Sequence, residues 1–215
     1  NIPVFSKFLD ASALANGELI NYANVARDCG VSAKTVKDYY QILEDTLLGF
    51  RLKPWVKSKT RRMIETEKFY YFDMGVVRKI QGISQVEKNT PTYGHYFEHF
   101  ILNEIRAYLS YSRLDLPMTF WRTHTTHQEV DLILGDMDIA IEIKAKSYVK
   151  AQDIKSLLAL KKEYPNVTLL VISFDPTPRY CHKDVLVLPW QQFCQNLWER
   201  GLYKVVTTLS KKKFV

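Results

Sequence analysis

The chain has few cysteines and no long apolar run. Of its 215 residues only three are cysteines, Cys29, Cys181 and Cys194, and they show no short paired spacing. This odd number argues against a disulfide framework and against a zinc site, so we expect a reducing compartment. No segment approaches the roughly 18 apolar residues of a membrane span, and no charged-then-apolar leader opens the chain. These absences favour a cytoplasmic protein without membrane contact, and the first residue, Asn1, suggests a piece of a longer polypeptide.

The composition is that of a globular, basic protein. Apolar residues make up 47% of the chain and charged residues 25%, which is a folded rather than a disordered balance. A chain of this length buries a sizeable core in one large domain or two small ones. The net charge of +7 and the pI near 9.2 favour an anionic partner, nucleic acid first among them. The alternative is a charge that serves solubility alone.

The first 82 residues predict a helix-turn-helix. A helix is expected from Ile2 to Ala15, a second from the cap Asn21 to Cys29, and a third after the cap Ser32. The apolar stripe expected on the third helix is Val36, Tyr40, Leu43 and Leu47. In a helix-turn-helix the third helix enters the major groove of DNA. The candidates for contacts with bases lie off that stripe: Lys34, Thr35, Lys37, Asp38 and Gln41.

A basic loop follows between two predicted strands, residues 47–52 and 68–73. Two strands around such a loop, directly after a helix-turn-helix, predict the wing of a winged helix. The basic side chains expected to meet phosphates are Lys53, Lys57, Lys59, Arg61 and Arg62. The alternative is a winged helix used for protein packing, with a merely solvated loop. Weak patterning and turn residues over 83–91 predict a linker between a domain at 1–82 and a domain at 92–215.

The second domain predicts an α/β fold with a mixed sheet, and the whole chain an α+β arrangement. The expected elements are a helix at 92–110, strands at 118–122 and 129–134, a strand at 139–146, a helix at 149–164, strands at 167–174 and 185–188, and a helix at 191–198. Strands joined by a hairpin are antiparallel, whereas a strand after a crossover helix is usually parallel to its neighbour. The apolar run at 167–174 is typical of a strand covered on both faces.

The hairpin at 129–146 carries the candidate chemistry. Strand alternation places Glu129 and Asp131 on one face of the first strand, and Glu142, Lys144 and Lys146 on one face of the second. Two carboxylates and a lysine on one surface suit a hard divalent cation and an attacking water. The alternative is an exposed face that carries ordinary cross-strand ion pairs.

The helix before the hairpin adds an acid. Glu98 falls at the edge of the apolar stripe, and His99 is expected on the polar side. A carboxylate at such an edge needs a cation, a donor or a metal, and a plain salt bridge is the alternative. A zinc site would draw on Glu98 and the four histidines His95, His99, His124 and His127. No H-E-x-x-H pattern is present, so solvent-facing histidines are the stronger expectation.

Two resemblances emerge from these residues. Glu98, then Asp131, then Glu142-Ile143-Lys144, on a helix, three strands, a helix and a strand, resemble the PD-(D/E)XK nuclease superfamily. Over nearly the whole chain, FYYFDMG, HYFEHFILNEI, EVDLIL and IEIKAK look like the C-terminal region, a domain of unknown function, of a prokaryotic AAA-type ATPase family. That family implies an upstream ATPase domain in the same polypeptide. No phosphate loop G-x-x-x-x-G-K-[ST] occurs here, so ATP hydrolysis is not expected.

The resemblance to nucleases implies a restriction-endonuclease-like αβββαβ domain after the winged helix-turn-helix predicted above. It implies Mg²⁺ or Mn²⁺ held by Asp131, Glu142 and Glu98, with Lys144 beside the attacking water and Lys150 and Gln152 as weaker polar contacts. No proline directly precedes Asp131, which departs from the superfamily pattern. Two functions stay open: a metal-dependent DNA endonuclease, or a non-catalytic module that uses the same fold to bind DNA or protein. The sequence does not indicate the oligomeric state.

Overall fold

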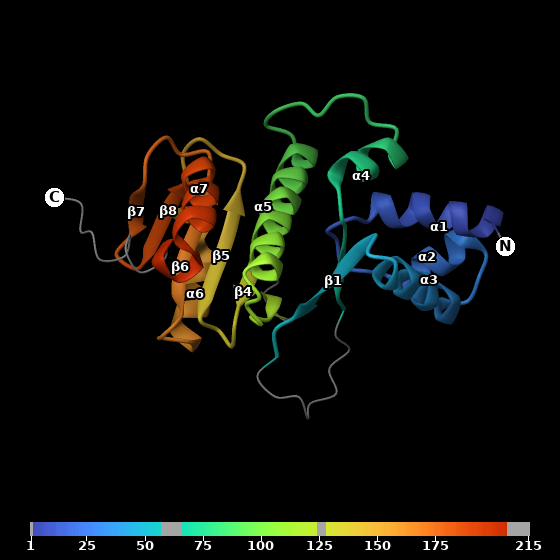
Figure 1. Ribbon diagram of the computed structural model, residues 1–215, viewed down its shortest axis with the longest axis horizontal. Helices are drawn as coiled ribbons and strands as arrows, with labels where there is room; N and C mark the ends of the chain where they lie inside the picture. The colour runs from blue at the N-terminus through green and yellow to red at the C-terminus, as the bar shows by residue number, and fades with distance from the viewer. Residues whose placement is uncertain (1, 57–65, 124–127, 206–215) are drawn as a thin grey trace. The chain divides into compact units, whose positions relative to one another are not determined.

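The chain divides into two compact units, residues 1–87 and residues 88–215, as the computed structural model shows (Figure 1). The structure describes residues 2–56, 66–123 and 128–205. In this part of the chain, no helix is long and apolar enough to cross a membrane. All three cysteines are free thiols.

Unit 1 is a helical bundle with one strand pair. Its elements are α1 (Ile2–Leu14), α2 (Tyr22–Cys29), α3 (Ala33–Asp45), the antiparallel strands β1 (Gly49–Pro54) and β2 (Lys68–Tyr71), and α4 (Met74–Ile80). The predicted caps are confirmed, because the Asn21 side chain accepts from the Asn24 N–H and the Ser32 side chain accepts from the Thr35 N–H. Gly30 ends α2 in the left-handed conformation at φ 69°.

An aromatic core holds unit 1 together. Tyr40 of α3 is fully buried, and its ring lies 4.9 Å between centroids from both Phe8 of α1 and Phe69 of β2. Phe69 in turn packs edge-on against Tyr71 at 5.3 Å. Aromatic pairs at such distances stabilise a core beyond the area that they bury. The apolar positions predicted for the third helix at Val36, Tyr40 and Leu43 therefore face the core, as expected.

The predicted position of Leu47 on that stripe is wrong. Leu47 is exposed and adopts a left-handed φ of 61°. The Leu47 N–H donates to the Glu44 carbonyl and the Leu48 N–H to the Leu43 carbonyl, so the helix ends in a Schellman motif. Glycine usually occupies this position, and its absence hid the helix end. The helix α4, capped by Asp73, was also not predicted, because only seven residues form it.

Unit 2 is built on a mixed sheet with the strand order β3-β4-β5-β6-β8-β7. The strands β3, β4 and β5 pair antiparallel, β5 and β8 flank β6 in parallel, and β7 pairs antiparallel with β8. The bounds are α5 (Pro91–Tyr111), β3 (Met118–Arg122), β4 (Glu129–Leu134), β5 (Ile139–Lys144), the 3-10 helix η1 (Ala151–Ile154), α6 (Lys155–Glu163), β6 (Thr168–Ser173), β7 (Arg179–His182), β8 (Val185–Pro189) and α7 (Trp190–Arg200). The predicted α/β class is confirmed.

Helices cover both faces of this sheet. The strands β5, β6 and β8 are buried at nearly every position, which requires cover on both sides. The helices α5 and α7 contact each other and share one face, where Phe97 of α5 packs 4.4 Å between ring centroids from Phe174. The helix α6 packs against β4 and β5 and covers the other face. The prediction for the strand at 167–174 is therefore confirmed.

In unit 2 one predicted helix start is wrong and one strand was not predicted. The helix expected from Val149 begins only at Ala151 as η1 and continues as α6, so residues 145–150 form a loop. The Val149 N–H donates to the Asp175 carboxylate, which follows β6, and the Val149 carbonyl accepts from Arg179 of β7, so neither group belongs to a helical turn. The strand β7 was not predicted, because its four residues show no alternation of burial.

Candidate functional site

The hairpin β4–β5 places two acids on one buried face. Its register sets Ile133 opposite Ala140, and Asp131 and Glu142 each lie two residues further along the same face. The exposed fraction is 8% for Asp131 and 5% for Glu142. The alternative of an exposed strand face with ordinary surface ion pairs is therefore excluded.

Asp131 is tied to the neighbouring strand. Its Oδ2 accepts a hydrogen bond from the Ile143 N–H at 2.7 Å. This contact is a buried charge-assisted bond, which is stronger than a bond between neutral groups. It fixes the carboxylate of β4 beside the end of β5, where Glu142 and Lys144 are carried.

Glu142 is only partly satisfied. The Lys144 Nζ lies 2.5 Å from Glu142 Oε1, whereas the buried Oε2 has no hydrogen-bond partner. Burial, and after it the charge of Asp131, raises the pKa of Glu142 well above its ordinary value of 4.5. Burial opposes the charge of Lys144, yet Asp131 and Glu142 together raise the pKa of this lysine, which stays protonated.

A cleft of about 530 Å³ opens over this pair. Glu98 from α5, Asp131 from β4 and Lys144 from β5 line it together with His95 and Lys146. Glu142 is not among the lining residues, but it pairs with Lys144, which is. The structure thus brings the four predicted residues of the candidate site to one place. Lys146 was expected on the same strand face but without a role in the site, and His95, three residues before Glu98 on the same side of a helix, only as a possible zinc ligand.

The donor set fits a magnesium ion better than a zinc ion. Within the described residues, no group of three or more His, Cys, Asp or Glu is arranged to hold a metal. Mg²⁺, however, commonly takes one or two carboxylates and completes its shell with water and phosphate oxygens. Asp131 and Glu142 meet that requirement, and the unpartnered Glu142 Oε2 is an oxygen that a cation would satisfy.

The predicted polar position of His99 is wrong. His99 is fully buried, whereas His95, one turn earlier, is exposed at the cleft. The helix α5 contacts both the sheet and α7, so its buried surface is wider than one stripe. The two histidines therefore do not converge as zinc ligands would. His124 and His127 lie outside the described residues.

The predicted nucleic-acid contacts of unit 1 differ in their surroundings. Lys34 is exposed, and the Lys37 Nζ lies 5.2 Å above the Tyr22 ring. The Thr35 hydroxyl lies 2.9 Å from the Ser32 hydroxyl. Gln41 donates to Asp45 and accepts from Arg51, so its amide is already engaged. The remaining loop candidates, Lys57, Lys59, Arg61 and Arg62, lie outside the described residues.

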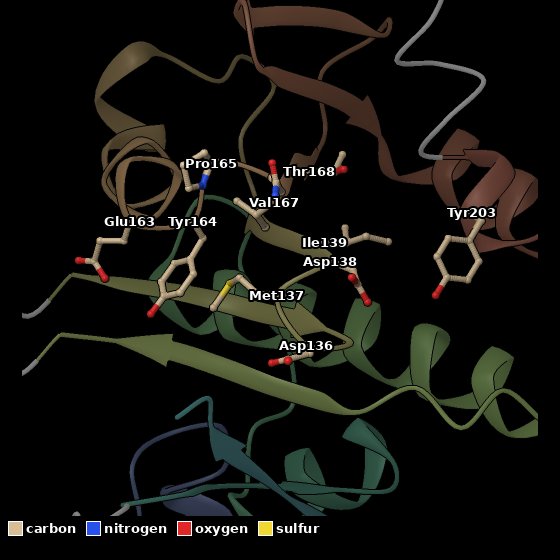
Figure 2. Close-up of a pocket in the computed structure, with 11 residues that line it drawn as sticks. Asp136, Met137, Asp138, Ile139, Glu163, Tyr164, Pro165, Val167, Thr168 and Tyr203 are labelled. Carbon is tan, nitrogen blue, oxygen red and sulfur yellow. The ribbon is translucent and has the colours of Figure 1, made fainter. Parts of the chain in front are cut away.

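A second pocket lies at the opposite end of β5. This hollow has a volume of about 690 Å³. Tyr164 and Tyr203 lie on two sides of it (Figure 2). Ile139 and Thr168, which begin β5 and β6, line it, whereas Lys144 at the far end of β5 lines the cleft. Its charged lining residues are all acids: Asp136, Asp138 and Glu163. An anionic substrate therefore finds no cationic side chain among these residues.

Comparison with known families divides the chain in the same way as the structure. Residues 1–87 match the domain of unknown function DUF8612. Residues 93–193 match the domain of unknown function DUF4143. That second domain occurs in proteins associated with AAA-type ATPases, and its matched region includes Glu98, Asp131, Glu142 and Lys144.

Two curated mycobacterial proteins are similar to this chain. They are the uncharacterized protein Mb2031c of Mycobacterium bovis and the uncharacterized protein Rv2008c of Mycobacterium tuberculosis. Each is 29% identical over 136 residues, which are 62% of this chain and 28% of the relative. The chain thus matches little more than a quarter of the length of these relatives. No solved structure matches it.

Proposed function

We propose that unit 2 is a PD-(D/E)XK-type domain that cuts DNA with Mg²⁺ or Mn²⁺, and that unit 1 is a winged helix that binds duplex DNA. The observation that carries this proposal is the buried Glu142 carboxylate, whose Oε2 has no partner beside a cleft that Asp131, Glu98 and Lys144 line. Burying a carboxylate without full pairing is costly. Strongly shifted acids in a cleft are typical of sites that do chemistry.

The charge balance of the cleft supports a cation. Asp131, Glu142 and Glu98 bring three carboxylates near the Lys144 ammonium group, whereas Lys146, which also lines the cleft, is paired with Asp153. In a cavity of low dielectric constant this excess of negative charge attracts a divalent ion. A bound Mg²⁺ would supply Lewis acidity and lower the pKa of a water molecule.

The chain's own residues have separable roles in this proposal. Asp131 and Glu142 hold the ion, and the Ile143 N–H keeps the Asp131 carboxylate in place. Lys144, kept protonated by its acidic neighbours, stabilises the negative charge that develops on the phosphoryl oxygens. Glu98 reaches the same cleft from α5.

Unit 1 supplies DNA affinity in this proposal. Its α3 presents Lys34 and Lys37 at the surface, and the whole chain carries a net charge of +7. Contacts of lysine with phosphate give affinity with little sequence information. The upstream ATPase domain of the same polypeptide, part of the same proposal, would direct where and when this module acts.

A cleavage assay tests the proposal. Purified protein with Mg²⁺ or Mn²⁺ is expected to cut plasmid or single-stranded DNA, and a chelator is expected to stop the reaction. Asp131→Asn and Glu142→Gln are each expected to lower the rate at least about a hundredfold. Asp136→Asn, an exposed acid in the turn of the same hairpin, serves as the matched control and keeps the activity.

The second candidate function is a non-catalytic module that binds DNA or protein. It is favoured by the lack of a three-ligand metal group among the described residues. It predicts intact DNA with every divalent ion, no heat of Mg²⁺ binding by calorimetry, and an affinity for DNA that survives Glu142→Gln. Those three results together would replace the nuclease proposal.

A further inference from the structure

A tyrosine stands exposed on the loop that follows the candidate site. Tyr148 lies four residues after Lys144 and two after Lys146, and both lysines line the cleft. Its exposed fraction is 60%, which is high for a large aromatic residue. The function proposed above gives this ring no role.

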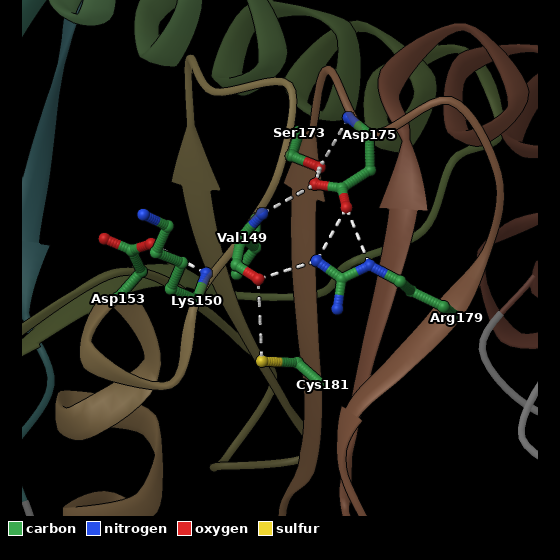
Figure 3. A network of polar contacts seen from close by, with 7 residues as sticks. All are labelled: Val149, Lys150, Asp153, Ser173, Asp175, Arg179 and Cys181. Atoms are coloured by element: carbon green, nitrogen blue, oxygen red, sulfur yellow. Dashed lines mark hydrogen bonds and ion pairs between the residues drawn. The ribbon is translucent and has the colours of Figure 1, made fainter.

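The backbone next to Tyr148 is clamped by a buried ion pair (Figure 3). The Val149 N–H donates to Asp175 Oδ2 at 3.0 Å, and the Val149 carbonyl accepts from Arg179 Nη2 at 2.6 Å. Asp175 and Arg179 pair with each other at 2.7 Å. Both backbone polar groups of Val149, the residue after Tyr148, are therefore held by charged partners, which make strong hydrogen bonds.

The other side of Tyr148 is anchored as well. The Phe174 N–H, at the end of β6, donates to the Lys146 carbonyl at 2.9 Å. The Lys146 Nζ pairs with Asp153 of η1 at 2.5 Å. Tyr148 thus projects from a short loop that is fixed before and after it. An exposed ring on a fixed backbone loses little conformational entropy when it binds a partner.

One face of the ring is already covered by a cation. The Arg179 guanidinium carbon lies 4.0 Å from the centroid of the Tyr148 ring. This contact holds the ring in one orientation and polarises it. Because Tyr148 remains largely exposed, the opposite face is open to a flat ligand.

The charges around the ring select the ligand. Lys150 is exposed directly after the clamped residue, and Lys146 and Lys144 precede it on the same segment. Proteins that bind single-stranded nucleic acid combine basic side chains along the backbone with aromatic rings on which bases stack. A peptide side chain could also stack on the ring, but a peptide does not in general carry the negative charge that is complementary to these lysines.

We propose that Tyr148 is a stacking platform for an unpaired base of a DNA strand at the mouth of the cleft. The base lies on the ring face away from Arg179, and Lys150 meets the neighbouring phosphate. This inference rests on DNA as the partner in the proposed function. It adds a preference for single-stranded or locally unpaired DNA over a continuous duplex.

Binding of labelled oligonucleotides without divalent ions tests the platform, with fluorescence anisotropy as the readout. Tyr148→Ala is expected to weaken binding of a mixed-sequence single strand about tenfold, the effect of losing one stacked base. The affinity of the same variant for a duplex of the same length is expected to stay unchanged, that is, within about twofold of the wild-type value. Tyr148→Phe is expected to bind like the wild type, because it keeps the aromatic face.

Two further variants keep the test decisive. Tyr148→Leu preserves apolar cover over Arg179 but lacks the aromatic face, so it is expected to behave like the alanine variant. Tyr111→Ala removes a tyrosine of α5 that is 81% exposed and should leave both affinities unchanged. Unchanged single-strand binding in Tyr148→Ala and Tyr148→Leu, or equal losses for strand and duplex, would overturn the platform. Since no cleavage is measured, an inactive nuclease site does not affect this outcome.

Discussion

Unit 1 and unit 2 both place two acids around one cation, but they satisfy those acids differently. In unit 1 the Arg51 guanidinium lies 3.1 Å from Glu44 and 3.3 Å from Glu67. Glu44 also accepts from the Arg51 N–H, and Glu67 from the Tyr22 hydroxyl. In unit 2 Lys144 pairs with Glu142 Oε1 and feels the charge of Asp131, whereas Glu142 Oε2 is buried with no partner. Each unit thus places two acids around one cation. The two units differ in the number of hydrogen-bond donors that reach the acids, and this difference distinguishes a structural network from a candidate site.

A third network shows that unit 2 is able to satisfy a buried acid completely. Asp175 accepts from the Val149 N–H, from the Ser173 hydroxyl and from the Arg179 guanidinium. Its side chain is fully buried, like that of Glu142. Of these two buried acids only Glu142 has a bare oxygen, although Thr119 Oγ1 and Trp190 Nε1 of unit 2 are also buried without a hydrogen-bond partner. Such a local departure is expected where a site binds a ligand.

The largest expected effect is loss of the Asp175 carboxylate. Asp175→Ala leaves the Arg179 charge without its buried partner, which is expected to lower the free energy of unfolding by about 3–5 kcal/mol. Urea denaturation followed by tryptophan fluorescence measures this change. Asp175→Asn, which keeps an acceptor oxygen, is expected to lose less. A loss below about 1 kcal/mol in the alanine variant would show that this network does not stabilise unit 2.

A smaller loss is expected in unit 1. Arg51→Met removes the cation that Glu44 and Glu67 share, and hydrogen bonds to charged groups contribute about 1.5–3 kcal/mol. Because both acids are partly exposed, we expect about 2 kcal/mol of lost stability, measured by urea denaturation with circular dichroism. Lys53→Met, on the exposed side of the same strand, is the control. A stability equal to that of the control would contradict the structural role of this network.

The smallest effect has the opposite sign. Glu142→Gln removes a carboxylate whose pKa burial and Asp131 hold above 4.5, so the folded state disfavours its charge. We expect a gain on the order of 1 kcal/mol at neutral pH. In the wild type, the raised pKa of Glu142 contributes stability that is fully present below pH 4.5. That contribution is lost as the pH rises through the pKa of the folded state, because the buried carboxyl group then has to ionise. The gain of the glutamine variant therefore grows with pH.

Urea denaturation of both proteins at several pH values measures that gain. Glu44→Gln in unit 1 is the matched control, because its carboxylate has two donors and its loss should lower stability. If Glu142→Gln is less stable than the wild type at every pH, the Glu142–Lys144 pair is a structural contact. The contrast between the two units would then disappear.

Local features of the fold were predictable from the sequence. The caps Asn21 and Ser32 act within three residues of themselves, so a short stretch of sequence contains their signal. The left-handed turn at Leu47 was not predictable, because leucine seldom adopts that conformation. The burial of His99 depends on how α5 packs against β5 and α7, which come later in the chain. No local pattern contains that information.

The candidate site was likewise predictable only in its local features. Strand alternation alone placed Asp131 with Glu142 and Lys144 on one face of a hairpin, because side chains alternate with a period of two along any strand. Only the tertiary structure decided that this face is buried and that Glu98 joins its cleft. The same holds for the loop of Tyr148, since Val149 and its partner Asp175 are 26 residues apart. Contacts of this range depend on how the layers pack, and the sequence pattern of either partner does not specify the other.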